Sequence, residues 1–160
     1  MSKLKSILSI IIVFLFSCTN KEDKLVQAEF DKLEGQWTIT NFKIGGSVAP
    51  NVKAYIKTGG ILFRKCIYNR KAFDKNTACG ADFDVNGELY GMGYKYDLST
   101  DIYDMSVGTY ASQTSQLQQA IAATLAGTYK IVIVGSTMTA VQKSNVNYSG
   151  LEVSFTATRK

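Results

Sequence analysis

Alternating apolar and polar positions recur along most of the chain from about residue 36 onward. In the last such segment Leu151, Val153, Phe155, Ala157 and Arg159 share one face, and polar residues share the other. Because successive side chains of a strand point to opposite faces, this pattern is typical of a strand that packs one face on a core. Comparable segments span 36–44, 52–57, 61–68, 80–85, 88–96, 102–110, 128–134, 137–142 and 151–159. The sequence therefore predicts an all-β protein with eight or nine antiparallel strands.

Two segments show helical spacing instead. Val26, Phe30 and Leu33 recur three or four residues apart before the first strand. Residues 113–126 are rich in Gln and Ala, carry apolar residues four apart, and are followed by Gly127, a typical helix-ending residue. We expect a short N-terminal helix and one amphipathic helix before the last three strands.

Turn residues fix the connections between two of the strand pairs. Asn86-Gly87 is a strong hairpin signal because both residues tolerate the positive φ of a type I′ turn. Gly135-Ser136 is a second, weaker signal of the same kind. The strands on either side of each turn should pair as neighbours.

The first residues form a different pattern from the rest of the chain. Lys3 and Lys5 precede an apolar run over residues 7–16, which ends in Leu15-Phe16-Ser17-Cys18. The run is shorter than the roughly 20 apolar residues that span a bilayer, and Leu15 is unusual for an ordinary cleavage site. This segment resembles a bacterial lipoprotein signal with its lipobox. A transmembrane anchor or an ordinary cleaved signal are the weaker interpretations.

The lipoprotein resemblance implies a specific division of the chain. Residues 1–17 would be a cleaved signal peptide, Cys18 would carry a diacylglyceryl group and an acyl chain such as palmitate, and 18–29 would be an acylated tether. The folded domain would then be 30–160. Two or three acyl chains hold a protein firmly on a membrane that no part of the protein crosses.

The charged residues after Cys18 are informative about the side of the membrane on which the protein lies. Lys21-Glu22-Asp23 resembles the surface-export signal of lipoproteins of Bacteroidetes. A solvated tether explains the same charges, as is usual for charge runs near termini. We expect an outer-membrane lipoprotein on the cell surface or on the periplasmic face.

Composition and charge narrow the class of partner. Nine tyrosines and eight phenylalanines, with many Thr, Val and Ile, suit pleated half-buried surfaces. The formal net charge of +5 falls to +3 once Lys3 and Lys5 are removed with the signal peptide. The remaining basic residues are scattered and form no stripe that could follow a phosphate backbone, so we expect no nucleic-acid binding.

The first and last strands point to a family. Gly35-Gln36-Trp37 follows the short helix, and alternation places Trp37, Ile39 and Asn41 on the inner face of the first strand. Gly-x-Trp resembles the opening motif of lipocalins and related calycins, in which an arginine of the last strand packs across the tryptophan. Arg159 matches that position. The resemblance implies an up-and-down β-barrel closed at one end by Trp37 and Arg159.

The chain also departs from the usual lipocalin pattern. The evident helix at 113–126 precedes the last three strands, whereas a typical lipocalin carries its main helix after the final barrel strand. This departure leaves open a nine-stranded or partly open barrel, and a β-sandwich is the alternative fold.

A face of large residues suggests where a ligand would bind. Tyr90, Met92, Tyr94 and Tyr96 share one face of the strand after Asn86-Gly87, and Tyr103 follows on the next strand. An eight-stranded barrel is just wide enough for packed side chains or one small ligand. If they face inward, these residues line a site for a small hydrophobic or amphipathic ligand. Otherwise they fill the barrel or cover its outer wall against the helix.

The remaining cysteines predict a disulfide. Cys66 and Cys79 would be exposed to an oxidising compartment, and they enclose a polar loop. Alternation places Cys66 outward, where a cysteine of that loop could meet it. Two cysteines without any histidine leave too few ligands for a zinc site.

Catalytic patterns are weak. The chain contains no histidine, which excludes Ser-His-Asp and Cys-His arrangements. Five carboxylates lie close in sequence; they are Asp82, Asp84, Asp97, Asp101 and Asp104. A solvated strand face explains the first two, and turn formation explains Asp97 and Asp101. The twelve-residue calcium loop is absent. We expect no enzyme, no metal and no cofactor.

Three functional hypotheses remain at this point. The first is a lipid-anchored, lipocalin-like protein that binds a small ligand in its barrel. The second is an envelope interaction module with a filled barrel that contacts a protein or a surface polysaccharide. The third is a divergent enzyme. The sequence does not indicate an oligomeric state.

Overall fold

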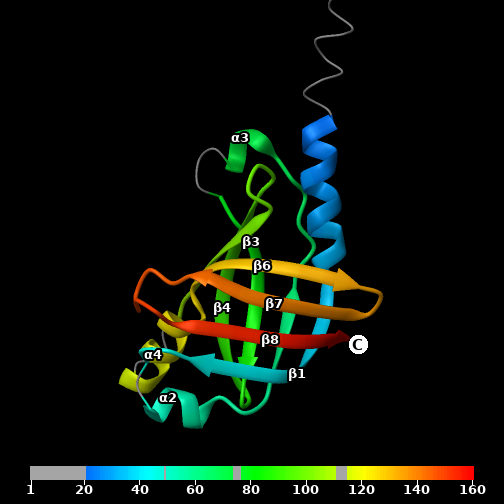
Figure 1. Ribbon diagram of the computed structural model, residues 1–160. Helices are drawn as coiled ribbons and strands as arrows, with labels where there is room; N and C mark the ends of the chain where they lie inside the picture. The colour runs from blue at the N-terminus through cyan, green and yellow to red at the C-terminus, as the bar shows by residue number, and fades with distance from the viewer. Residues whose placement is uncertain (1–20, 49, 74–76, 111–114) are drawn as a thin grey trace, which may run out of the picture.

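The computed structural model describes residues 21–48, 50–73, 77–110 and 115–160 as one closed antiparallel β-barrel (Figure 1). Each strand pairs with the next along the chain, and the last strand pairs with the first. This is the up-and-down order, and it confirms the predicted all-β barrel. Closure leaves no strand edge unpaired, which removes the usual route to edge-to-edge aggregation.

The elements follow the chain in a simple order. The strands are β1 Gly35–Gly45, β2 Gly59–Phe63, β3 Cys79–Val85, β4 Glu88–Asp97, β5 Ile102–Val107, β6 Gly127–Val134, β7 Thr137–Ser144 and β8 Glu152–Arg159. The helices are the N-terminal helix over residues 21–33, α2 Pro50–Tyr55, α3 Arg70–Phe73 and α4 Gln116–Leu125. Both predicted helices and both predicted hairpins are present.

The expected strand at 52–57 is wrong, because this segment contains α2. Val52 and Ile56 are four residues apart, a spacing that fits one face of a strand and one face of a helix equally well. Both side chains are buried. Pro50 begins the helix, where its missing N–H costs nothing. The barrel therefore has eight strands and not nine.

The strand predicted at 36–44 is present, but its inner face changes halfway. Trp37 and Ile39 are buried as expected, whereas Asn41 is exposed. The pairing of β1 with β8 shifts between Ile39 and Asn41, as in a β-bulge. The extra residue turns Phe42 toward the interior, where its ring stacks on Phe155 at 5.6 Å.

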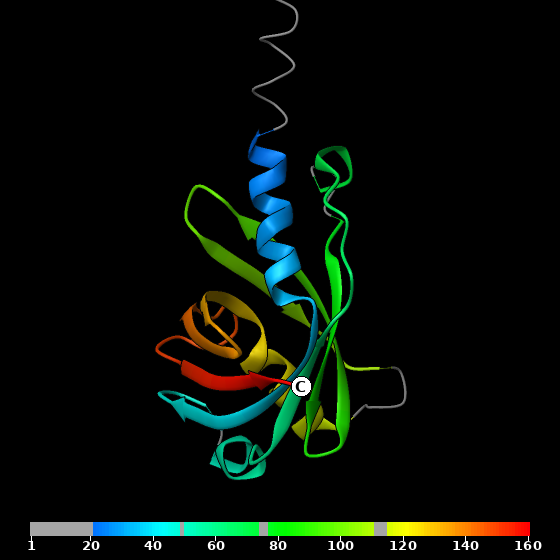
Figure 2. The same ribbon diagram turned by 90° about the vertical axis from the view of Figure 1, so that its right-hand side faces the viewer.

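Helices cover both ends of the barrel, as the two views show (Figures 1 and 2). The N-terminal helix covers one end with Phe30 and Leu33, whose exposed fractions are 1% and 0%. At the opposite end α2 and α4 supply Val52, Ile121 and Leu125, each 0% exposed. Residues 21–29, expected to be a tether, already form most of the N-terminal helix, and Val26 in this segment is buried.

After β5 ends, the chain at Tyr110 lies on the outside of the barrel. Tyr110 lies over β4, and a Cβ on Gly91 would be only 3.7 Å from its ring. The Tyr110 hydroxyl donates a hydrogen bond of 2.7 Å to Asp82 on β3, which also accepts from Arg64. The glycine in the outer face of β4 therefore provides the space for the Tyr110 ring.

Candidate functional site

The predicted tyrosine face lies inside the barrel. Tyr90, Met92, Tyr94 and Tyr103 are 0–5% exposed, whereas Tyr96 at the end of β4 is half-buried. Neighbouring strands bring Tyr96 and Tyr103 together, with their ring centroids 4.7 Å apart. The alternation of the sequence predicted that the residues of β4 share one face, and the structure shows that this face is the inner one.

These inner side chains pack against other side chains. The Tyr94 ring meets Phe30 of the N-terminal helix and Phe63 of β2 edge-on, with centroids 5.6 and 5.2 Å apart. Further along the barrel Phe155 contacts Phe83 and Tyr129 at 6.0 and 6.1 Å. These buried rings are 0–2% exposed, so almost none of their surface faces a void large enough to hold a water molecule. A drug-sized ligand needs about 300 Å³ or more, so this arrangement is a packed core.

Hydrogen bonds satisfy most of the inner hydroxyls. Tyr90 donates to Glu88 at 3.0 Å, and Tyr103 donates to Glu29 of the N-terminal helix at 3.1 Å. Tyr129 donates to the carbonyl of Leu125 at 2.9 Å. The first bond lies within β4, and the other two tie a strand to a neighbouring helix, which is a structural role.

Tyr94 is different, because its buried hydroxyl has no hydrogen-bond partner among the described residues. Burial raises the pKa of Tyr94 to about 12, and the charge of Glu34 adds to the rise. Leaving a hydroxyl unpaired in an apolar interior costs about 1–3 kcal/mol. Among the described residues, the side-chain oxygen of Gln142, whose amide donates to Tyr129, is a second buried polar atom without a partner.

The barrel-closing pair has the geometry that the resemblance implies. The Arg159 guanidinium lies 4.6 Å from the centroid of the Trp37 ring, within the range of a cation–π contact. Arg159 also donates to the carbonyl of Lys32, and the Trp37 indole donates to the carbonyl of Leu33 at 2.8 Å. The pair therefore holds the end of the N-terminal helix against the barrel.

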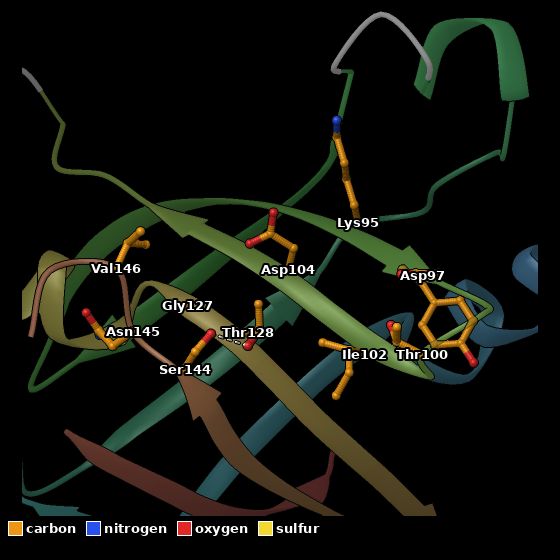
Figure 3. A pocket seen from close by; sticks show the side chains of 11 residues that line it. Lys95, Asp97, Thr100, Ile102, Asp104, Gly127, Thr128, Ser144, Asn145 and Val146 are labelled. Atoms are coloured by element: carbon orange, nitrogen blue, oxygen red, sulfur yellow. Dashed lines mark hydrogen bonds between the residues drawn. The ribbon is translucent and has the colours of Figure 1, made fainter. Parts of the chain in front are cut away.

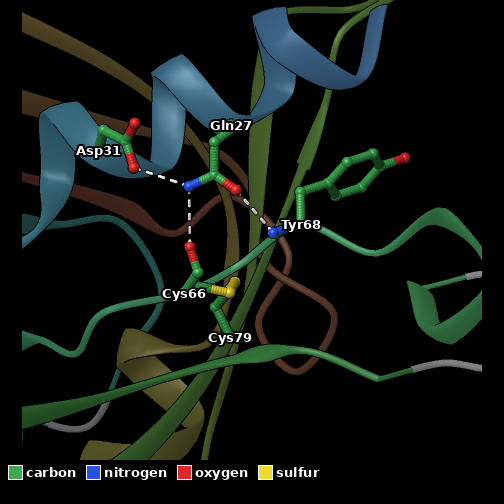
Figure 4. The surroundings of a disulfide bond; sticks show 5 residues. All are labelled: Gln27, Asp31, Cys66, Tyr68 and Cys79. Atoms are coloured by element: carbon green, nitrogen blue, oxygen red, sulfur yellow. Dashed lines mark hydrogen bonds between the residues drawn. A yellow bond between two sulfur atoms is a disulfide. The ribbon is translucent and has the colours of Figure 1, made fainter. Parts of the chain in front are cut away.

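The predicted disulfide joins Cys66 and Cys79, with their Cα atoms 5.6 Å apart. Cys79 is buried at the start of β3, and Cys66 lies in the loop, so the strand and loop partners are the reverse of those expected. Figure 4 shows that Gln27 of the N-terminal helix bonds to the loop backbone on the Cys66 side of this bridge. Its amide donates to the carbonyl of Cys66 at 2.9 Å and accepts from the backbone N–H of Tyr68 at 2.7 Å. The disulfide loop thus helps to position the helix.

A groove on the outside of the barrel was not predicted from the sequence. Its volume is about 820 Å³, and it lies where the β4–β5 hairpin meets the beginning of β6 and the end of β7 (Figure 3). Its lining combines hydroxyl, amide and charged side chains with two apolar ones; it comprises Lys95, Tyr96, Asp97, Thr100, Ile102, Asp104, Gly127, Thr128, Ser144, Asn145 and Val146. These residues come from four separate segments and form no motif, so no sequence pattern could have identified them.

Close backbone approach builds the floor of this groove. A Cβ on Gly127 would lie 2.3 Å from the carbonyl oxygen of Ser144, so only glycine fits here. The Thr128 and Ser144 hydroxyls are 2.7 Å apart, and Asn145 donates to the carbonyl of Ala126 at 2.7 Å. The floor is therefore fixed before any partner binds.

The carboxylates considered for catalysis have structural partners or lie apart. Asp82 pairs with Arg64; burial raises its pKa, but the hydrogen bonds from Tyr110 and Arg64 outweigh this, so its pKa is below the usual value. Asp84 accepts from the backbone N–H of Gly87 in the hairpin turn at 2.9 Å. Asp101 pairs with Lys130, and that hydrogen bond lowers the pKa of Asp101.

The two carboxylates that line the groove are exposed. Hydrogen bonds from the Ser99 hydroxyl and backbone N–H to Asp97 lower the pKa of its carboxyl, and the bond from the N–H is 2.8 Å long. Asp104 lies opposite Lys95 in the pairing of β4 with β5. Within the described ranges, no three Cys, Asp or Glu side chains are grouped closely enough to hold a metal ion.

Several predictions concern the beginning of the chain. The signal peptide at 1–17 and the acylated Cys18 lie outside the described residues. In the part of the chain that the structure covers, no helix has both the length and the apolarity needed to cross a bilayer.

The chain was compared with protein-family models, with curated proteins and with solved structures. None of the three comparisons found a match. The closed barrel, its packed interior and its outer groove therefore carry the functional conclusion.

Proposed function

We propose that this protein is a membrane-anchored, non-catalytic binding protein that uses a lipocalin-like barrel as a rigid scaffold and contacts its partner through the outer groove. The packed interior is the observation that carries this proposal. Rings from the strands and from the N-terminal helix fill the space that a barrel ligand would occupy, and helices cover both ends. Binding at the surface requires no rearrangement of this core.

The groove chemistry favours a partner rich in hydroxyl groups, such as a surface polysaccharide. Thr100, Thr128, Ser144 and Asn145 can exchange hydrogen bonds, and the carboxylate of Asp104 is a strong acceptor. Thr128 and Ser144 already bond to each other and Asn145 bonds to the backbone, so this preference depends chiefly on the exposed carboxylate of Asp104. An open groove also admits a segment of a long polymer, whereas a closed barrel admits only a small molecule.

The membrane anchor in this proposal is the acylated Cys18. Its support is the lipobox pattern of Leu15-Phe16-Ser17-Cys18, and the expected location is the bacterial outer membrane. Replacing Cys18 with alanine should release a folded barrel into the soluble fraction of the host. If the Cys18→Ala protein remains with the membrane, the anchor is assigned to the wrong residue.

A second candidate function is the binding of a small hydrophobic ligand inside the barrel, among Tyr90, Met92, Tyr94, Tyr96 and Tyr103. The unpaired hydroxyl of Tyr94 favours it, because a bound ligand could supply the missing partner. Phe30 would have to move from the Tyr94 ring to make room, and this would displace part of the N-terminal helix. Interior binding thus requires a second conformation of the barrel end.

Native mass spectrometry of protein purified from its own host separates the two candidates. A reproducible small-molecule mass on the folded barrel would support interior binding. For the groove, we would measure binding of the host's cell-envelope polysaccharide fraction to Asp104→Ala. Loss of a charged hydrogen-bond acceptor costs about 1.5–3 kcal/mol, which corresponds to roughly ten-fold to more than hundred-fold weaker binding.

The matched control for this measurement is Glu152→Ala. Glu152 is an exposed strand carboxylate like Asp104, but it lies on β8 and is not part of the groove lining. Both variants should retain the circular dichroism spectrum of the parent. Equal affinity of Asp104→Ala and Glu152→Ala for the polysaccharide fraction would remove the groove from the proposal.

A further inference from the structure

One end of the barrel is set apart by the elements that project from it. The N-terminal helix, α3 and the turn between β4 and β5 all lie at this end, while α2, α4 and the turn between β3 and β4 lie at the other (Figures 1 and 2). The Asn86 side chain accepts a hydrogen bond from the backbone N–H of Thr58 and donates one to the carbonyl of Tyr55, which ties the β3–β4 turn to the end of α2. We call the end with the N-terminal helix the anchor end.

The sequence places the anchor residue close to this end. Only Thr19 and Asn20 separate Cys18 from Lys21, the first described residue of the N-terminal helix. An extended chain spans at most about 3.3–3.6 Å per residue, so Lys21 lies within about 11 Å of Cys18 whatever the conformation between them. A lipid chain on Cys18 would therefore hold the anchor end next to the headgroups.

The anchor end exposes apolar side chains. Leu25 on the helix is 48% exposed, Ile67 beside the disulfide is 76% exposed, and Leu98 in the β4–β5 turn is 37% exposed. They come from three elements that are far apart in the sequence. Leu98 and Val26 also line a cleft of about 560 Å³ between the helix and the turn. Exposed leucine and isoleucine side chains at one end of a barrel gain favourable free energy of transfer from water when they enter the membrane interface.

The charges at this end suit a membrane surface. Arg70 forms ion pairs with Glu22 and Asp23, each 2.9 Å long, so its single positive charge offsets one of the two negative charges in the first helical turn. Lys21 and Lys24 are exposed on the same helix. Exposed lysines beside a lipid anchor are attracted to anionic headgroups.

We propose that the anchor end is a membrane-docking face, which rests on the lipid surface with Leu98 in the headgroup region. The outer groove then lies on the side of the barrel and opens parallel to the membrane. The proposal rests on the anchor at Cys18 that the proposed function assigns. Its basis is the short connection from Cys18, the apolar residues of three elements and the exposed lysines. The barrel would then stand end-on and would not hang freely on a tether.

The test couples the mature chain 18–160, without its acyl chains, to vesicles. Cys18 is the only free thiol because Cys66 and Cys79 are joined, so a maleimide lipid reacts at Cys18 alone. The vesicles contain phosphatidylcholine, phosphatidylglycerol and a brominated phosphatidylcholine that quenches tryptophan fluorescence. The variant Leu98→Trp reports on the anchor end, and the signal of the fully buried Trp37 is subtracted with the unsubstituted protein.

Leu89→Trp is the matched control. Leu89 is 49% exposed and lies at the other end of the same strand, about 30 Å from Leu98 at roughly 3.3 Å per residue. We expect bromolipid to quench Leu98→Trp and to leave Leu89→Trp unchanged. In the unsubstituted coupled protein, the amides of residues 98–101 should also exchange more slowly with solvent than in the uncoupled protein.

Equal quenching of the two variants, or quenching of neither together with unchanged amide exchange, would overturn the proposal. Chemical coupling supplies the anchor in this experiment, so its outcome does not depend on natural acylation of Cys18. If the coupled protein fails the quenching test while the native protein is bound to the membrane through Cys18, only the docking face is refuted. Retention of the native Cys18→Ala protein on the membrane, together with quenching of Leu98→Trp in the coupled protein, would count against the proposed anchor alone.

Discussion

The hydroxyl of Tyr94 allows a direct test of whether the barrel interior is a packed core or a binding site. It is buried and has no hydrogen-bond partner among the described residues. In a dry core, the variant Tyr94→Phe removes an unsatisfied polar atom and keeps the ring contacts with Phe30 and Phe63. An unpaired buried hydroxyl costs about 1–3 kcal/mol, so we expect the free energy of unfolding to rise by up to that amount.

Tyr129→Phe is the matched control, because the same atom is removed from a paired site. The Tyr129 hydroxyl donates to Leu125 at 2.9 Å and accepts from the Gln142 amide at 3.0 Å. Its removal leaves the Leu125 carbonyl without this donor and takes one acceptor from the Gln142 amide, which still donates to Thr124 and Ala126, so the free energy of unfolding should fall by about 1–3 kcal/mol. The two tyrosine-to-phenylalanine changes should therefore shift stability in opposite directions.

Urea unfolding followed by circular dichroism measures both changes. The midpoint concentration should move upward for Tyr94→Phe and downward for Tyr129→Phe, with an unchanged slope if both variants stay equally compact. A loss of stability in Tyr94→Phe as large as in Tyr129→Phe would refute the reasoning. Such a loss would mean that water or a ligand occupies a site beside Tyr94, and interior binding would then become the better proposal.

Three further predictions follow from contacts around the barrel. Replacing Cys66 and Cys79 together with serine should lower the free energy of unfolding by about 3 kcal/mol on the loop-entropy model, measured by urea unfolding. The pKa of Asp82 is lowered in the folded state, so its stabilisation is present above the unfolded pKa near 3.8 and is lost as pH falls below it. Asp82→Asn should thus flatten the acid side of a plot of melting temperature against pH, and an unchanged acid slope would contradict this. Arg159→Lys should lower the free energy of unfolding by about 1 kcal/mol through the weaker contact with Trp37, whereas equal stability would show that the stacked guanidinium adds nothing.

The sequence determined the features that depend on local periodicity. Alternation alone assigned Phe155 to the inside of the barrel and placed Tyr90, Tyr94 and Tyr96 together on one face, because the two faces of a strand differ at every second residue. Asn86-Gly87 fixed its hairpin, since both residues have the positive φ that the turn requires. The single pair of cysteines that follows Cys18 left one disulfide to form within the domain.

Tertiary structure decided the features that depend on residues far apart in the chain. Val52 and Ile56 fit a strand and a helix equally well, and only packing at the barrel end selected α2. The bulge after Ile39, which turned Asn41 outward, arises from pairing with β8 more than a hundred residues away. Whether the aromatic face encloses a cavity depends on how completely rings from other elements fill it, and Phe30 of the N-terminal helix does so. The outer groove likewise exists only because four distant segments meet, so periodicity carries no trace of it.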